Sequence, residues 1–228
     1  IAIASTKGGV GKSTIGLNLT CELSSDHKVV LLDADPQGTA IKWSSVRTYM
    51  IEEENLDLQS IFIASMQGES LLEMAIEKSE TGHIVFIDTR GADSKSTRSA
   101  LLRCDYILTF SAPSPADLWE VEVIIDMAKS LGKIQKKKIP VLLAYNRVPT
   151  NRRVTSVRDA KEYLDENMIA PDYIFDALIH ERIAFQHSIR EGKAVSEYKD
   201  SAARVEIANL ADEFIQFLGV TKDKRKAS

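Results

Sequence analysis

The sequence predicts an α/β fold with a doubly wound, mostly parallel β-sheet flanked by helices, and three observations support this. Short apolar runs rich in Val, Ile and Leu recur along the chain, as is typical of parallel strands buried on both faces. Stretches with apolar residues at helical spacing separate these runs. A chain of 228 residues, 44% of them hydrophobic, can bury a large core. Alternating strands and helices imply right-handed crossovers.

The elements follow in order from these patterns. We expect strands at residues 1–5, 28–35, 83–88, 106–112 and 139–146. Two segments predict helices clearly, because each gathers apolar side chains on one face. In residues 115–131 these are Leu118, Val121, Ile125 and Ala128, and near the end of the chain they are Ile207, Leu210, Ala211, Phe214 and Leu218. No repeat or linker divides the chain, so we expect one domain over residues 1–228, with 219–228 as a frayed basic tail.

Composition excludes several classes of protein. The formal net charge of −4 argues against a protein surface that is basic on all sides, so any DNA binding requires a local basic patch. No apolar run is long enough to cross a bilayer, and no signal-peptide pattern is present. Cys21 and Cys104 are far apart and lack metal-binding spacing, which favours small core residues of a reduced, cytoplasmic protein.

The stretch "KGGVGKST", residues 7–14, follows the first predicted strand and precedes a helix. Its glycines let successive backbone N–H groups point inward, and the helix N-terminus adds positive potential, so the loop favours a polyphosphate. Lys12 would reach the β- and γ-phosphates, and the Ser13 hydroxyl would bind Mg²⁺. The predicted nucleotide-binding residues of this loop are Lys7, Gly8, Gly9, Val10, Gly11, Lys12, Ser13 and Thr14.

The loop departs from the common G-x-x-x-x-G-K-[ST] spacing, which would place glycine where the chain has Thr6. In this it resembles the deviant Walker A loop of the ParA/MinD family of P-loop ATPases. The resemblance implies that Lys7 reaches across a dimer interface to the nucleotide bound by the partner subunit. The alternative for Lys7 is an ordinary solvated loop lysine.

Two further motifs extend the resemblance. "DADPQG", residues 33–38, is similar to the second motif of the family. The similarity implies that Asp35 orients the attacking water and that Asp33 supports the magnesium shell. From the residues alone, capping of the next helix explains this pair equally well. "HIVFID" has the form of a Walker B strand, whose carboxylate, Asp88, would hold Mg²⁺.

After Asp88 the chain departs from the family pattern with Arg90 and Gly91. Arg90 is a candidate for a phosphate contact, a DNA contact or a surface salt bridge. The "DTRG" sequence is similar to that of ParA-like accessory ATPases of conjugative DNA-transfer systems. This similarity keeps DNA transfer (a relaxosome role) as an alternative function.

The later segments resemble those of small, ParF-like partition ATPases. Asn146 and Arg147, at the end of the strand predicted over 139–146, are candidates for adenine contacts, although Asn146 could equally cap a loop. Nonspecific DNA contacts are expected nearer the end of the chain. The candidates are Arg182, Arg190, Lys193 and Arg204, with a charged solvent-exposed face as the alternative for each.

The resemblance implies a Mg²⁺-dependent partition ATPase that is cytoplasmic and associated with the nucleoid when ATP-bound. ATP would drive homodimerisation and nonspecific DNA binding. Slow ATP hydrolysis would reset this switch, and a small ParB/ParG-like adaptor bound to a centromere-like site would stimulate the hydrolysis. The first strand begins at residue 1, which leads us to expect the small subclass without an amino-terminal DNA-binding module. A MinD-type membrane-positioning ATPase is less favoured, because "TKDKRKAS" offers no apolar helical face.

Overall fold

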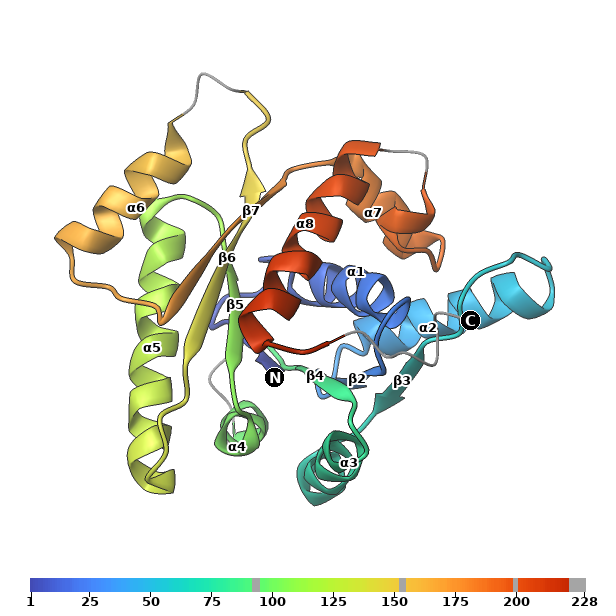
Figure 1. The fold of residues 1–228 in the computed structure, drawn as a ribbon, viewed down its shortest axis with the longest axis horizontal. Helices are drawn as coiled ribbons and strands as arrows, with labels where there is room; N and C mark the ends of the chain where they lie inside the picture. Colours follow the sequence, from blue (N-terminus) through green and yellow to red (C-terminus); the bar gives the residue numbers. More distant parts are fainter. Residues whose placement is uncertain (92–94, 152–154, 199–200, 222–228) are drawn as a thin grey trace. The chain divides into compact units, whose positions relative to one another are not determined.

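A computed structural model describes residues 1–91, 95–151, 155–198 and 201–221 (Figure 1). These residues form two compact units. The first unit combines Ile1–Lys12 with Thr89–Glu181, and the second combines Ser13–Asp88 with Arg182–Ser228. The predicted division into one domain over 1–228 stays a prediction, and most of the predicted tail, 222–228, lies outside the described residues.

The helices and strands alternate along the chain, as expected. Their bounds are β1 Ala2–Ile3, α1 Lys12–Ser24, β2 Val29–Asp33, α2 Thr39–Glu52, β3 Phe62–Ser65, α3 Gly68–Glu80, β4 Ile84–Asp88, α4 Lys95–Arg103, β5 Ile107–Ser111, α5 Pro115–Gln135, β6 Val141–Val148, α6 Ser156–Glu166, β7 Tyr173–His180, α7 Ile183–Arg190, the 3₁₀ turn η1 Val195–Glu197, and α8 Ser201–Leu218.

The first unit contains parallel strands in the order β1-β5-β6-β7. Helix α5 packs against β5 and β6 and also contacts α4 and α6 (Figure 1). The apolar face predicted for α5 is confirmed, because Leu118, Val121, Ile125 and Ala128 are all buried in the core of this unit. Burial of the Leu, Val and Ile side chains among them contributes about 1.5–3 kcal/mol each.

Local sequence sets both ends of α5. Ser114 is the N-cap, and its hydroxyl accepts a hydrogen bond from the backbone N–H of Asp117. Pro115 occupies the first helical turn, where its missing N–H has no intrahelical partner to lose. At the other end Lys136 adopts a left-handed conformation with φ 54° and donates its N–H to the Gly132 carbonyl. The helix therefore begins at Pro115, directly after its N-cap, and ends at Gln135, before a turn formed by Lys136, Lys137 and Lys138.

The second unit contains the parallel strands β3-β2-β4, with β2 between its neighbours. The register pairs Asp33 at the end of β2 with Asp88 at the end of β4. The predicted apolar face of α8 packs in this unit's core, where Phe86 and Phe214 lie with ring centroids 5.6 Å apart. The carboxyl ends of β2 and β4 thus place two aspartates side by side.

The fold class predicted from the sequence is confirmed, as are the five predicted strands, which are β1, β2, β4, β5 and β6. Strands β3 and β7 were not predicted. Cys21 and Cys104 are buried free thiols, as expected, and burial raises the pKa of Cys21 to about 12. Within the described part of the chain, no helix combines the length and apolar character that a membrane crossing requires.

Candidate nucleotide-binding site

The phosphate loop begins in the first unit, directly after β1. Gly9 and Gly11 have positive φ values of 79° and 97°, a backbone region that other residues rarely adopt. A Cβ at Gly8 or Gly9 would meet no described atom within 4 Å, so the described residues leave space beside both glycines. Lys12 is only 6% exposed, and its Nζ donates to Ser5 Oγ at 2.9 Å. The phosphate loop therefore combines two glycines in left-handed backbone conformations with the buried ammonium group of Lys12.

Asn146, predicted as an adenine contact or a loop cap, is buried and holds the phosphate loop. Its Nδ2 donates to the Val10 carbonyl at 2.7 Å. This bond fits the capping alternative, while the adenine contact stays a prediction. Arg147 is exposed and has a positive φ of 54°. Its charge acts on the pKa values of both Lys7 and Asp117, so it lies in the same electrostatic environment.

Gly91, where the chain departs from the family pattern, packs directly against the phosphate loop. A Cβ at this position would lie 2.9 Å from the Lys7 carbonyl oxygen, 3.0 Å from Lys12 Nζ and 3.1 Å from the Gly8 Cα. Two of these atoms belong to the backbone, so they can move away only if the loop itself shifts, which costs free energy. The absence of a side chain at 91 is therefore a packing requirement of the loop.

Lys7 stands at the mouth of the loop, and its side chain is 50% exposed. Its Nζ bonds Asp117 Oδ1 in the first turn of α5 at 2.7 Å, and the Ser114 hydroxyl donates to the other carboxylate oxygen at 2.6 Å. Burial opposes ionisation of Asp117. The hydrogen bonds from Lys7 and Ser114 and the charge of Lys7 outweigh it and lower the pKa of Asp117. Asp117 was missed at the sequence level, although Asp is common in a first helical turn.

The second motif lies in the second unit, where Asp33 caps α2. Its Oδ2 accepts hydrogen bonds from the backbone N–H groups of Ala40 at 3.0 Å and Ile41 at 3.2 Å. The helix-capping alternative is thus observed. Burial raises the pKa of Asp33, against these backbone hydrogen bonds, which lower it. Asp35 is half-buried, and its Oδ1 accepts from the Gln37 N–H at 2.9 Å.

Asp88 ends β4 and is 1% exposed, beside Asp33 in the register of the two strands. Within the described residues, no group of three or more His, Cys, Asp or Glu side chains is arranged to hold a metal ion. Mg²⁺ in phosphate sites uses one or two carboxylates together with phosphate oxygens and water, so such a group is not required. Two buried carboxylates and the half-buried Ser13 fit that donor set.

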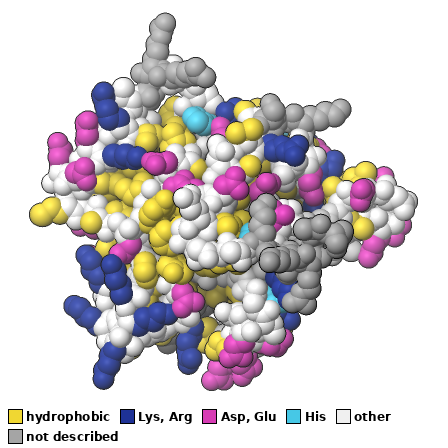
Figure 2. Space-filling model, in the orientation of Figure 1, with side chains coloured by type: hydrophobic (Ala, Val, Ile, Leu, Met, Phe, Trp, Pro, Cys, Tyr) yellow, Lys and Arg dark blue, Asp and Glu magenta, His cyan; other side chains and the backbone are white. Residues whose placement is uncertain are grey.

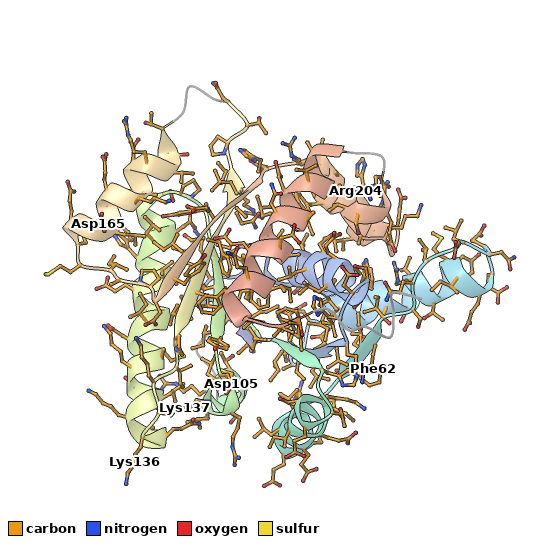
Figure 3. All side chains as sticks on the ribbon, viewed as in Figure 1. Phe62, Asp105, Lys136, Lys137, Asp165 and Arg204 are labelled. Carbon is orange, nitrogen blue, oxygen red and sulfur yellow. The ribbon has the colours of Figure 1, made fainter. Side chains whose placement is uncertain are left out.

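The four predicted DNA-contact residues lie in the second unit and differ in availability. Arg182 donates to Glu206 from Nε at 3.1 Å and from an Nη at 2.7 Å, and Lys193 lies 3.5 Å from Glu191. Arg190, with its side chain 73% exposed, and Arg204 on α8 (Figure 3) are exposed. The structure thus leaves Arg190 and Arg204 as the more accessible candidates.

Comparison with known proteins identifies the family. Residues 1–195 match the family described as the CobQ/CobB/MinD/ParA nucleotide binding domain. "Maintenance of carboxysome distribution protein A" of Halothiobacillus neapolitanus is 25% identical over 217 residues, covering 94% of this chain and 95% of that protein. The "Virulence plasmid ParA family protein pGP5-D" of Chlamydia trachomatis is 23% identical, covering 98% and 96% of the two chains. "Protein virC1" of Rhizobium radiobacter is 28% identical over 188 residues, 81% and 78%.

Solved structures share the fold. Apo McdA from Cyanthece superimposes with a TM-score of 0.71 at 17% identity, covering 93% of this chain and 98% of that one. The AMPPNP-bound plasmid partition protein BB_S35 of Borrelia burgdorferi B31 gives a TM-score of 0.65 at 20% identity, covering 95% and 98%. The matched segment includes the phosphate loop, both aspartate motifs and the Asn146 anchor, and this chain belongs to the CobQ/CobB/MinD/ParA family of nucleotide-binding ATPases.

Proposed function

We propose that this protein is a ParA-type partition ATPase whose ATP-bound chains pair, bind nonspecific DNA as the pair, and separate after slow hydrolysis stimulated by an adaptor protein. One observation carries the proposal. The two lysines of the phosphate loop occupy different environments, since Lys12 is buried beneath the loop while half of the Lys7 side chain is exposed at its mouth. Of these two lysines, Lys7 is the one a second chain can reach.

The other residues take separate roles in this proposal. Backbone N–H groups of the loop and Lys12 bind the phosphates and stabilise charge that develops on them. Ser13, Asp33 and Asp88 hold Mg²⁺, which neutralises phosphate charge when bound. Asp35 orients the attacking water. Lys7, released from Asp117, contacts the nucleotide of the opposite chain and makes hydrolysis conditional on pairing.

Two other roles compete with plasmid partition. The second candidate function is to maintain the distribution of a carboxysome-like protein assembly. It is favoured by relatives from two organisms that are named for maintenance of carboxysome distribution. The DNA-transfer alternative was favoured by the Arg90–Gly91 departure. The packing of Gly91 against the phosphate loop gives the glycine of that departure a structural reason independent of any cargo, and Arg90 still favours this alternative.

DNA binding tests the proposal. Binding of a duplex of arbitrary sequence should require ATP and should weaken steeply as salt rises, because phosphate contacts release counterions. Reversing charge at the exposed Arg190 and Arg204 should weaken it, whereas reversal of Lys42, an exposed lysine elsewhere in the second unit, should not. Equal binding with and without nucleotide would contradict the proposed switch.

A further inference from the structure

A groove of about 710 Å³ lies in the first unit, at the end of α5. Its apolar lining comes from the last turns of α5, the segment that leads into β6, the first residue of β6 and the loop before β7. These residues are Ile125, Ala128, Ile139 and Val141, each at most 7% exposed, and the more exposed Ala170 and Pro171. Its volume lies within the range of about 300–1,000 Å³ that is typical of ligand-binding pockets. None of the roles assigned above uses this groove.

Lysines surround the groove. Lys129 and Lys133 come from α5, and Lys136, Lys137 and Lys138 come from the turn that follows it. Figure 2 shows Lys and Arg side chains gathered around this end of α5 beside hydrophobic surface, and Figure 3 labels Lys136 and Lys137 there. The sequence "KIQKKKIP" contains this cluster, whereas the expected basic contacts lie nearer the end of the chain.

The backbone fixes the lysine turn in place. The N–H groups of Lys136 and Lys137 both donate to the Gly132 carbonyl, the second at 3.1 Å. A Cβ at Gly132 would lie only 2.7 Å from the Lys137 carbonyl oxygen, so glycine allows the turn to fold back onto the helix. The groove and its basic rim are therefore built features of the fold.

The rim carries excess positive charge. Lys129, Lys137 and Lys138 form ion pairs with Asp126, Asp105 and Asp172 respectively. Lys133 and Lys136 are exposed, and among the described residues no carboxylate lies within ion-pair distance of either. An anionic group approaching the groove would gain their attraction without first breaking an ion pair.

We propose that this groove docks an acidic amphipathic helix of a partner protein. Apolar side chains of that helix fill the groove, and its carboxylates contact Lys133 and Lys136. Binding through an apolar helical face with flanking charges is a recurrent mode of peptide recognition. DNA fits less well, since a phosphate backbone has no apolar groups to place against the accessible Ala170 and Pro171.

The position of the groove separates it from nucleotide chemistry. Asp117 and Gly132 lie on the same helix, and a rise of 1.5 Å per residue puts them about 22 Å apart. Groove variants should therefore leave ATP binding unchanged. This proposal does not depend on the proposed partition function.

The test uses a fluorescein-labelled synthetic peptide with leucines at helical spacing and glutamates on its flanks, and the full chain. Fluorescence anisotropy should detect binding of this peptide, and should detect none for a version with lysines in place of glutamates. The double variant Lys133→Glu/Lys136→Glu should lower affinity about tenfold or more. Ala170→Trp, which fills the groove from an exposed position without changing charge, should lower it similarly.

Matched controls complete the experiment. Lys42→Glu/Lys161→Glu reverses two lysines outside the groove and should retain peptide affinity, and unchanged ATP binding shows that each variant is folded. Peptide binding that survives both groove variants would overturn the proposal. So would equal binding of a scrambled peptide. Failure of the acidic peptide, together with loss of duplex DNA binding in the double lysine variant, would instead make this a nucleic-acid surface.

Discussion

At the scale of single residues, the two lysines of the phosphate loop occupy different environments. Lys12 is buried beneath the loop and bonded to Ser5, while Lys7 is exposed at its mouth and paired with Asp117. In a single chain the side chain of Lys7 is thus held by α5. Pairing with a second chain must break this bond before Lys7 can contact another nucleotide.

The Lys7–Asp117 pair predicts a pKa change. Replacing Lys7 with Gln removes a charge and a charge-assisted hydrogen bond, so the pKa of Asp117 should rise from its lowered value. A depressed carboxyl pKa contributes stability that is present above the unfolded-state pKa and lost as pH falls through the folded-state pKa. The variant should therefore lose less stability on acidification. Carboxyl ¹³C titration by NMR measures the shift, with Lys133→Gln as the control, and an unchanged Asp117 pKa in Lys7→Gln would contradict the pairing.

Gly91 carries a second prediction at this scale. Gly91→Ala places a Cβ against the Lys7 carbonyl and the Gly8 Cα, so the loop must shift even without nucleotide. We expect faster hydrogen exchange of the loop amides and ATP affinity lowered about tenfold, because misplaced N–H donors bind phosphate poorly. Gly8→Ala meets no described atom within 4 Å, so without nucleotide its loop amides should exchange at the wild-type rate. Wild-type exchange and affinity in Gly91→Ala would show that the loop tolerates the methyl group.

At the scale of elements, Arg47 joins α2 to the turn around η1 within the second unit. It is 3% exposed, donates to the Gln59 and Gly192 carbonyls at 2.8 and 3.0 Å, and pairs with Glu197 at 2.6 Å. Its guanidinium also lies over the Trp43 ring, 4.9 Å from the centroid. Gly192 must lack a side chain, since a Cβ there would lie 2.6 Å from the Arg47 backbone nitrogen.

Arg47→Met should destabilise the protein by about 3 kcal/mol, because it leaves buried acceptors and Glu197 without their donor. Urea denaturation measures the free energy of unfolding. Lys129→Met breaks the ion pair with Asp126, in which the Lys129 and Asp126 side chains are 68% and 67% exposed. This variant should lower the free energy of unfolding by less than about 0.5 kcal/mol. Equal losses in the two variants would show that the Arg47 network adds little.

The helices and strands also show which parts of the fold sequence patterns can predict. The five predicted strands are continuous apolar runs, and they form as expected. Strand β3 was not predicted because its sequence "FIAS" is too short to form a continuous apolar run. The strand is also partly exposed, with Phe62 46% exposed. Strand β7 mixes polar and apolar residues. The motifs made Lys12, Asp33 and Asp88 candidates, and these stay predictions. Asp117 and Gly91 contact the phosphate loop through packing between segments far apart in sequence, which a local sequence pattern does not indicate.

At the scale of the whole molecule, we propose that Lys7 acts on the nucleotide of the opposite chain. The claim makes each site depend on residues from two chains, with Asp35 supplied by the chain that binds the nucleotide. Lys7→Ala and Asp35→Ala should each hydrolyse little ATP alone, for different reasons. Their defects therefore lie in different chains of a mixed pair.

Mixing the two variants measures whether Lys7 acts across the pair. In a mixed pair, the site on the Lys7→Ala chain retains Asp35 and receives an intact Lys7 from the Asp35→Ala chain. An equal mixture that pairs at random should recover roughly a quarter of wild-type ATP hydrolysis, since half of all pairs are mixed and each mixed pair has one complete site out of two. A mixture with no more activity than the separate variants, although light scattering shows that mixed pairs form, would contradict the claim.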